Sequence, residues 1–279
     1  MNYACIDDFT RFQRKDGKWN YRNKEGEIVS IGKWFKWVSD FYDGFGCVQR
    51  TDGLWNYIDR EGNILSLKWF TDVLPFINGF ARVQREDDMW NFIDEKGNIL
   101  SPRWFKWTHN FSATLAQVQR EDGLWNIIDK HGNILSSNFW FASIDTFYGD
   151  FATVKREDGK WNYVDKKGNI LSLKWFKFAA QFSNGFARVR REDDLWNFID
   201  TKGNTLSPNQ WFGWVTPFKN GYGLVRNSDN KWGIINANGI IIIDMNFDEI
   251  SYRKHHLIGY IKDSKYLIDT SFKIHRLLI

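Results

Sequence analysis

The 279-residue sequence has few of the residues that kink or cross-link a chain, with four prolines and two cysteines. The cysteines, Cys5 and Cys47, are too few for a disulfide framework, so we expect a cytoplasmic location. The sequence has no apolar run of 18 residues, so no transmembrane helix is predicted. Its first residues lack the basic and apolar regions of a signal peptide, so none is expected as given.

The sequence also lacks a large excess of charge of either sign. The chain has 38 basic and 34 acidic residues, which gives a formal net charge of +4. The two signs alternate along the chain, as in Arg85-Glu86-Asp87, which is typical of a solvated mixed surface rather than a nucleic-acid-binding stripe. We therefore expect no nucleic-acid partner and no membrane association.

Tryptophan, in contrast, is abundant, with 16 residues, and aromatic residues make up 18% of the chain. Both values are well above ordinary usage. Seven of the tryptophans recur at spacings of 35 or 36 residues: Trp19, Trp55, Trp90, Trp125, Trp161, Trp196 and Trp232. A fixed period of this length predicts tandem repeats. Because no segment breaks the period, we expect residues 1–279 to form a single continuous array.

Each repeat has the pattern of an antiparallel meander of four short strands. The Asn-Gly pair at 78–79 predicts a two-residue turn, and Asp52-Gly53 predicts another with positive φ at both positions. The segment 55–59 is rich in strand-forming residues, a glycine at a fixed place (Gly62) predicts a third turn, and a further strand is expected at 63–66. Applied along the chain, this frame gives eight units. The first is thin, with Tyr3 to Ile6 as its opening strand, and the last is degenerate, with Tyr266 in place of Trp.

Both faces of the strand 54–58 are apolar, because Trp55 and Tyr57 lie on one face and Leu54 and Ile58 on the other. Each sheet should therefore stack between its neighbours, with the repeated Trp as the large filler. The predicted fold is all-β, with eight tandem antiparallel meander repeats of about 35 residues. A propeller-like toroid is slightly preferred, and an open β-superhelix or solenoid is the alternative.

Three sequence patterns resemble the WG (KWG) repeats, a family of bacterial β-repeats with units of this length. They are Lys-Trp-Gly-Ile-Ile-Asn at 231–236, Asp-Gly-Lys-Trp at 16–19 and 158–161, and Asn-Gly-Phe-Ala at 78–81 and 184–187. The resemblance covers nearly the whole chain and implies a binding scaffold rather than a reaction. Two features depart from the family pattern. Six of the seven repeated tryptophans precede Asn instead of Gly, and Trp-Phe pairs stand where Tyr-Asp is usual: 34–35, 69–70, 104–105, 140–141, 175–176 and 211–212.

The polar residues that recur in the repeats have structural explanations. The serines that end the segment after the third turn should close a further turn through hydroxyl–backbone bonds, and the carboxylates three residues before the fixed glycine should accept backbone N–H groups in the third turn. These residues are Ser30, Ser66, Ser101, Ser136, Ser172 and Ser207, and Asp59, Asp94, Asp129, Asp165 and Asp200. The pair His255-His256 has no cysteine near it, so no metal site is expected. No phosphate loop or nucleophile elbow is present, so we predict no catalytic residue, no cofactor and no enzyme activity.

Two functions remain open: a non-catalytic scaffold that binds a protein or peptide partner, and a lectin-like module that binds glycans on exposed tryptophans. The first candidate residues are Trp37, Trp107 and Trp214, which not every repeat requires. Further candidates come from the Trp-Phe pairs: Trp69, Trp104 and Trp175. An aromatic row with cations beside it would suit an extended ligand. The nearby cations are Lys33, Lys36, Lys68, Arg103, Lys106, Lys174 and Lys177.

Overall fold

The computed structural model describes residues 9–253 and 256–277, and these residues form strands, turns and loops. The strand expected at Tyr3 to Ile6, Cys5 and His255 lie outside the described residues. By its internal contacts the chain divides into two compact units, Met1–Trp140 and Phe141–Ile279. The structure places no membrane-spanning helix among the residues it describes.

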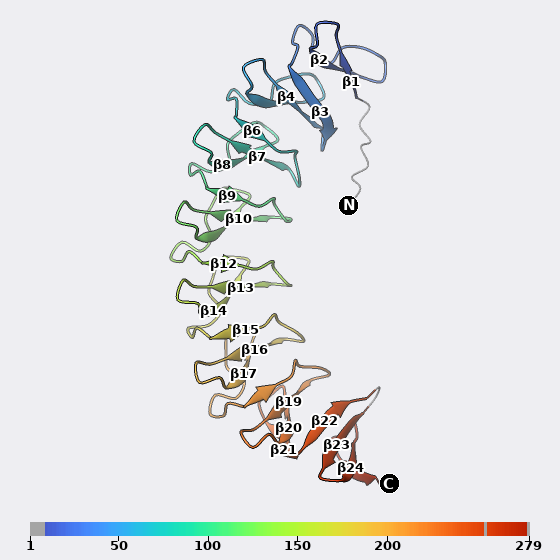
Figure 1. Cartoon of the computed structure of the whole chain (residues 1–279), viewed down its shortest axis with the longest axis vertical. Coiled ribbons are helices and arrows are strands. Elements are labelled where there is room, and N and C mark those ends of the chain that lie inside the picture. Colours follow the sequence, from blue (N-terminus) through green and yellow to red (C-terminus); the bar gives the residue numbers. More distant parts are fainter. Residues whose placement is uncertain (1–8, 254–255, 278–279) are drawn as a thin grey trace. The chain divides into compact units, whose positions relative to one another are not determined.

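Unit 1 consists of successive antiparallel sheets (Figure 1) with the strand orders β1-β2, β3-β4-β5, β6-β7-β8 and β9-β10-β11. Each sheet is a meander of neighbouring strands. The strands are β1 (Thr10–Gln13), β2 (Trp19–Arg22), β3 (Trp37–Tyr42), β4 (Phe45–Gln49), β5 (Trp55–Ile58), β6 (Asp72–Val73), β7 (Phe80–Gln84), β8 (Trp90–Asp94), β9 (Trp107–Thr108), β10 (Leu115–Gln119) and β11 (Trp125–Asp129).

Unit 2 continues the same pattern with the orders β12-β13-β14, β15-β16-β17, β18-β19-β20-β21 and β22-β23-β24-β25. Its last two sheets have four strands. The strands are β12 (Ser143–Ile144), β13 (Phe151–Lys155), β14 (Trp161–Asp165), β15 (Phe178–Ala179), β16 (Phe186–Arg190), β17 (Trp196–Asp200), β18 (Trp214–Val215), β19 (Tyr222–Arg226), β20 (Trp232–Asn236), β21 (Ile241–Phe247), β22 (Glu249–Tyr252), β23 (Leu257–Ile261), β24 (Ser264–Ile268) and β25 (Ile274–Leu277).

The fourth strand predicted for each repeat is absent from the three-stranded sheets. After β5, the chain forms only isolated bridges, from Ile64 to Ile58 and from Phe70 to Trp55. The loop between the bridges is held by the fully buried Asn56, whose Nδ2 donates to the carbonyl oxygens of Ser66 (2.8 Å) and Lys68 (2.9 Å). A side-chain amide here satisfies backbone groups that a strand would otherwise pair. The prediction of a regular strand at 63–66 was therefore wrong.

The sheet around Trp232 shows the reason. Here Gly233 stands where six other repeats have Asn, and the continuous strand β21 pairs with β20, with two shifts in register. A Cβ atom at position 233 would lie 2.4 Å from the carbonyl oxygen of Ile243, so any side chain there would push β21 away. Glycine thus admits a fourth strand at close range, whereas asparagine binds an irregular segment in its place.

The turns confirm one prediction and correct another. Asn78 and Gly79 both have positive φ, 55° and 83°, as a two-residue type I′ turn requires. In the Asp-Gly pair, only Gly53 has positive φ (93°). Its N–H donates to the carbonyl of Arg50 (3.0 Å), and the N–H of Arg50 donates to the carbonyl of Leu54 (2.8 Å). This is a three-residue turn that ends in a left-handed glycine, so the expectation of two positive φ values was wrong.

The core of each unit lies between successive sheets. Its large fillers are the residues two positions after the repeated Trp, such as Tyr57 and Tyr163, which are fully buried. The Tyr57 hydroxyl donates to the carbonyl of Leu74, which lies 2.6 Å away and directly follows β6 of the next sheet. Trp55 is only partly buried against this cluster. The prediction that the repeated Trp is the main filler was therefore wrong for this repeat, although Trp90 is buried.

The glycine at a fixed place joins one repeat to the preceding one. Gly97 has φ of 81°, and a Cβ atom there would lie 2.0 Å from the carbonyl oxygen of Leu65. The Ser66 hydroxyl donates to the carbonyl of Gly97 (3.2 Å) and accepts the N–H of Lys68 (3.3 Å). The same close approach occurs at Gly62, Gly132, Gly203 and Gly239. The predicted serine turn is confirmed here, and it also binds the next repeat.

The carboxylates before this glycine cap the turn, as predicted. Asp94 Oδ1 accepts the backbone N–H groups of Lys96 (3.0 Å) and Asn98 (2.8 Å). The equivalent carboxylates Asp59, Asp129, Asp165 and Asp200 make the same pair of contacts. Their lone pairs are used within the turn, which accounts for their presence in each of these repeats.

Candidate binding surface

The three tryptophans that vary between repeats lie on the surface. Trp37, Trp107 and Trp214 are 41%, 44% and 37% exposed. Each is the first residue of an edge strand, β3, β9 or β18. The residue that follows each of them is buried, because side chains alternate along a strand and one face packs on the core. The backbone register therefore directs these indoles outward.

Each exposed indole is held edge-on by a tryptophan of the repeated series. The ring centroids of Trp107 and Trp90 are 5.9 Å apart with an interplanar angle of 66°. The pair Trp214 and Trp196 has 4.8 Å and 63°, and the pair Trp37 and Trp55 has 5.4 Å and 68°. T-shaped contacts of this kind are favourable and fix the orientation of both rings. The surface indoles are thus pre-oriented.

An arginine lies beside two of these pairs. The Arg82 guanidinium carbon is 5.8 Å from the ring centroids of both Trp90 and Trp107, and its Nη1 donates to the carbonyl of Thr108 (2.7 Å). Burial lowers the pKa of Arg82, which still leaves it cationic at neutral pH. Its Nε is buried without a hydrogen-bond partner among the described residues.

Unit 2 contains an equivalent set of one arginine and two tryptophans. The Arg188 guanidinium carbon lies 5.9 Å from the centroids of both Trp196 and Trp214, and its Nη1 donates to the carbonyl of Val215 (3.3 Å). Burial lowers the pKa of Arg188 as well. We call these two sets the Trp–Arg–Trp clusters. Neither arginine was a candidate from the sequence. The available signal was an Arg in the middle of the matching segments Phe-Ala-Arg-Val at 80–83 and 186–189.

The other three predicted tryptophans, Trp69, Trp104 and Trp175, are half-buried and each lies under an arginine. The guanidinium carbon of Arg50 is 4.6 Å from the Trp69 centroid. The corresponding distances are 4.9 Å from Arg85 to Trp104 and 4.7 Å from Arg156 to Trp175. A ring covered in this way is not an open platform, so the structure separates these residues from the exposed indoles.

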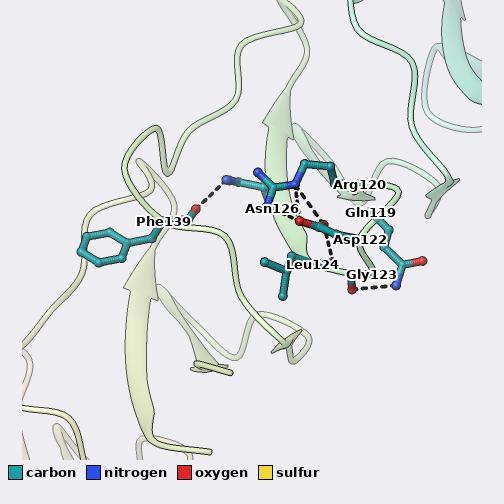
Figure 2. A network of polar contacts seen from close by, with 7 residues as sticks. All are labelled: Gln119, Arg120, Asp122, Gly123, Leu124, Asn126 and Phe139. Carbon is teal, nitrogen blue, oxygen red and sulfur yellow. Dashed lines mark hydrogen bonds and ion pairs between the residues drawn. The ribbon is translucent and has the colours of Figure 1, made fainter. Parts of the chain in front are cut away.

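Figure 2 shows how such an arginine is held at the turn before Trp125. Arg120 Nε donates to both carboxylate oxygens of Asp122, each at 2.9 Å, and Asp122 Oδ1 accepts the N–H of Leu124 at 3.2 Å. Gln119 Nε2 donates to the carbonyl of Gly123 (2.8 Å) across the same turn. The Arg120 guanidinium also lies 4.8 Å from the Trp140 centroid. The arginine therefore links the turn to the indole.

The cations predicted beside the aromatic row are all exposed: Lys33, Lys36, Lys68, Arg103, Lys106, Lys174 and Lys177. Lys177 forms an ion pair with Asp194 at 2.7 Å. Of the histidine pair, His256 is described and exposed. Within 9–253 and 256–277, the structure shows no group of three or more His, Cys, Asp or Glu side chains placed to hold a metal ion.

Among solved structures, the computationally designed Ika8 protein is 14% identical, with 98% of this chain and 94% of that chain covered and a TM-score of 0.32. BamB from Moraxella catarrhalis is 12% identical, with 92% of each chain covered and a TM-score of 0.30. The WD40 beta propeller domain of Doa1 is 15% identical, with 81% and 88% covered and a TM-score of 0.28. A comparison with curated proteins found no match.

The family comparison bears on the repeats directly. The model "WG containing repeat" matches residues 57–90, 163–196, 198–232 and 232–266. These segments begin at the residue two positions after a repeated Trp, or at a Trp itself, and each spans one period. They lie in both compact units, and the last of them contains the Trp-Gly pair at 232–233. These four repeats of the chain are therefore WG repeats, which confirms the resemblance found in the sequence.

Proposed function

We propose that the chain is a non-catalytic scaffold that binds a protein or peptide partner through its exposed indoles, above all through the Trp–Arg–Trp clusters. The observation that carries this proposal is the recurrence of one exposed arrangement, Arg82 beside Trp107 and Arg188 beside Trp214, at distances that agree within 0.1 Å. Tryptophan and arginine are enriched at protein interfaces and dominate their binding energy. Pre-oriented rings also lose little conformational freedom on binding.

The charge of the clusters favours a partner that carries carboxylates and apolar side chains. A guanidinium beside an indole offers a flat apolar face together with N–H donors in one place. Repetition of the arrangement would let an extended partner make several weak contacts at once, so its affinity would rise with length. The finer architecture, eight repeats in a propeller-like toroid or in an open superhelix, is part of the proposal and is tested by small-angle X-ray scattering.

The test is selection of binders from a random peptide display library, followed by calorimetry with each selected peptide. The triple variant Trp37→Ala, Trp107→Ala and Trp214→Ala should bind at least tenfold more weakly, because interface tryptophans commonly contribute about 2 kcal/mol or more each. The matched control replaces exposed apolar residues outside the clusters: Leu67→Ala, Tyr148→Ala and Leu173→Ala. Peptides that bind the triple variant undiminished would contradict the proposal, as would a collapse of its melting temperature.

Glycan binding is the second candidate, favoured by the exposure of the three indoles, since sugar rings stack on such faces. A glycan array probed with the same two triple variants separates the candidates. Signals that depend on Trp107 and Trp214 in the absence of any selected peptide would favour the lectin-like function.

A cytoplasmic location also remains a proposal, supported by the free, buried thiol of Cys47. Cell fractionation tests it.

A further inference from the structure

A pair of stacked phenylalanine rings recurs at the junction between successive sheets. One ring begins the middle strand of a sheet, as Phe186 begins β16, and the other, Phe218, lies before the turn of the next sheet. The centroid distances are 4.3 Å for Phe45–Phe76, 4.4 Å for Phe80–Phe111 and 4.3 Å for Phe186–Phe218. Asn184 Nδ2 bridges the last of these junctions by donating to the carbonyl of Phe218 (2.7 Å).

The junction between the last two sheets of unit 2 differs in each of these respects. Tyr222 and Tyr252 replace the phenylalanines, and their ring centroids are 6.0 Å apart. Lys219 stands before the Asn-Gly turn, where the preceding junction has Ser183. A cavity of about 430 Å³ opens here, lined by Lys219, both tyrosines, Arg253 and other residues of the last sheet. Its volume lies within the range of small-molecule sites.

One wall of the cavity is aromatic. Tyr222 lies edge-on to Phe272, with centroids 5.2 Å apart, and the Lys219 ammonium is 5.1 Å from the centroid of Tyr252. The hydroxyl of Tyr252 is buried beside Thr216, which does not line the cavity. The wall therefore offers a flat ring an aromatic contact surface.

The remaining lining is predominantly basic, because it includes Lys219, Arg253 and the imidazole of His256. The one carboxylate among the lining residues belongs to Asp269. Its Oδ1 accepts the backbone N–H groups of Ser271 (2.9 Å) and Lys273 (3.0 Å), and its Oδ2 lies 2.9 Å from His275 Nε2. Its charge is thus directed into the turn, and the lysine and arginine remain to attract an anion.

We propose that this cavity binds a small oxyanion attached to a flat ring, such as an aromatic carboxylate or an aryl phosphate. The ring would lie against the tyrosine wall, and the oxyanion would meet Lys219 and Arg253. This site is distinct from the Trp–Arg–Trp clusters and does not depend on their function. It arises at one junction because that junction alone, among the ring pairs described above, combines two tyrosines with an adjacent lysine.

The test is titration calorimetry of the full chain with phenyl phosphate and with benzoate. Inorganic phosphate supplies the anion without the ring, and phenol supplies the ring without the strong anion. At least one of the two complete probes should bind tenfold or more tightly than both halves. Absence of saturable binding by either complete probe would overturn the proposal, as would equal affinity for the halves.

The double variant Lys219→Ser with Tyr252→Phe restores the residue types of the preceding junction. It should weaken binding of the better probe at least tenfold while the melting temperature stays within a few degrees. The matched control makes similar changes at exposed positions of unit 2, Lys174→Ser with Tyr148→Phe, and should bind like the wild type. If the double variant does not fold, the affinity of the single variant Lys219→Met for the better probe takes its place in the test. This change keeps an apolar side chain of similar length and removes the charge. Unchanged affinity in the folded variant would overturn the proposal.

Discussion

Asn126 pairs with Ser136 through both ends of its side-chain amide. Nδ2 donates to the Ser136 carbonyl (2.9 Å), and Oδ1 accepts the Ser136 N–H (3.2 Å), which is the exchange that two paired strand residues make through their backbones. The same Nδ2 also donates to the carbonyl of Phe139 (2.8 Å). An asparagine side chain therefore acts as the edge of the sheet at a place where the backbone leaves strand geometry.

Asn126→Ala should lower the free energy of unfolding by about 2–4 kcal/mol, because it removes the three hydrogen bonds that the buried amide makes to the backbone of Ser136 and Phe139. Asn133→Ala is the matched control. Asn133 is exposed, and its side chain donates only to Asp129 across a turn (3.0 Å). Its loss should cost less than about 1 kcal/mol. Urea unfolding of both variants measures the difference, and equal costs would contradict the role given to the buried amide.

Gly97→Ala and Gly53→Ala separate backbone strain from contact between repeats. Both glycines have positive φ, 81° and 93°, but a Cβ at Gly53 meets nothing within 4 Å, whereas at Gly97 it would lie 2.0 Å from the Leu65 carbonyl oxygen. Gly53→Ala should cost about 1–2 kcal/mol from the left-handed conformation alone. Gly97→Ala should cost clearly more, because the preceding repeat must also move. Similar losses in chemical denaturation would show that the glycine serves only its own turn.

The pair Arg156–Asp158 predicts a dependence on acid pH. The hydrogen bond from Arg156, whose Nε donates to Asp158 Oδ1 at 3.0 Å, is the main reason why the pKa of Asp158 falls from 3.8 to about 2. The folded value lies below the unfolded one, so the contribution to stability is complete above about pH 4 and is lost as the pH falls toward 2. The effect is small because the pair is exposed.

The measurement for this pair is the difference in melting temperature between the wild type and Asp158→Asn from pH 6 to pH 2. The difference should shrink steadily below about pH 4. Glu157→Gln, at the exposed neighbouring position, controls for the loss of one negative charge. A difference that stays constant or grows on acidification would contradict the account of this ion pair.

The periodic features were predictable from the sequence because they depend on local chemistry. The Asn-Gly turns and the carboxylate-capped turns follow from residue type, and the surface position of Trp107 was expected because not every repeat requires this tryptophan; the structure shows all three. The fourth strand was mispredicted because Ile64 and Leu65, directly after a turn, give the segment 63–66 the appearance of a short strand. Only the position of Asn56, opposite that run across the sheet, shows that a side chain takes over its pairing.

The arginines of the Trp–Arg–Trp clusters were missed for a different reason. Arg82 lies within a strand in which charged and apolar residues alternate, and solvent exposure is the usual interpretation of such a position. Its contact with Trp107 joins residues 25 positions apart (82 to 107), in adjacent sheets, so it depends on stacking that sequence spacing does not specify. The same holds for the cavity beside Tyr252, which arises from the distance between two sheets.

The claim that the exposed indoles bind the partner is tested most directly by hydroxyl-radical footprinting. Mass spectrometry would measure the oxidation of each tryptophan with and without a selected peptide. In the free protein, Trp37, Trp107 and Trp214 should oxidise fastest and Trp90 and Trp196 slowest, in the order of their exposure. Bound peptide should protect Trp107 or Trp214, and Trp69 and Trp175, already covered by arginines, should change little. Protection that leaves all three exposed indoles unaffected would contradict the central claim, because the partner would then bind elsewhere.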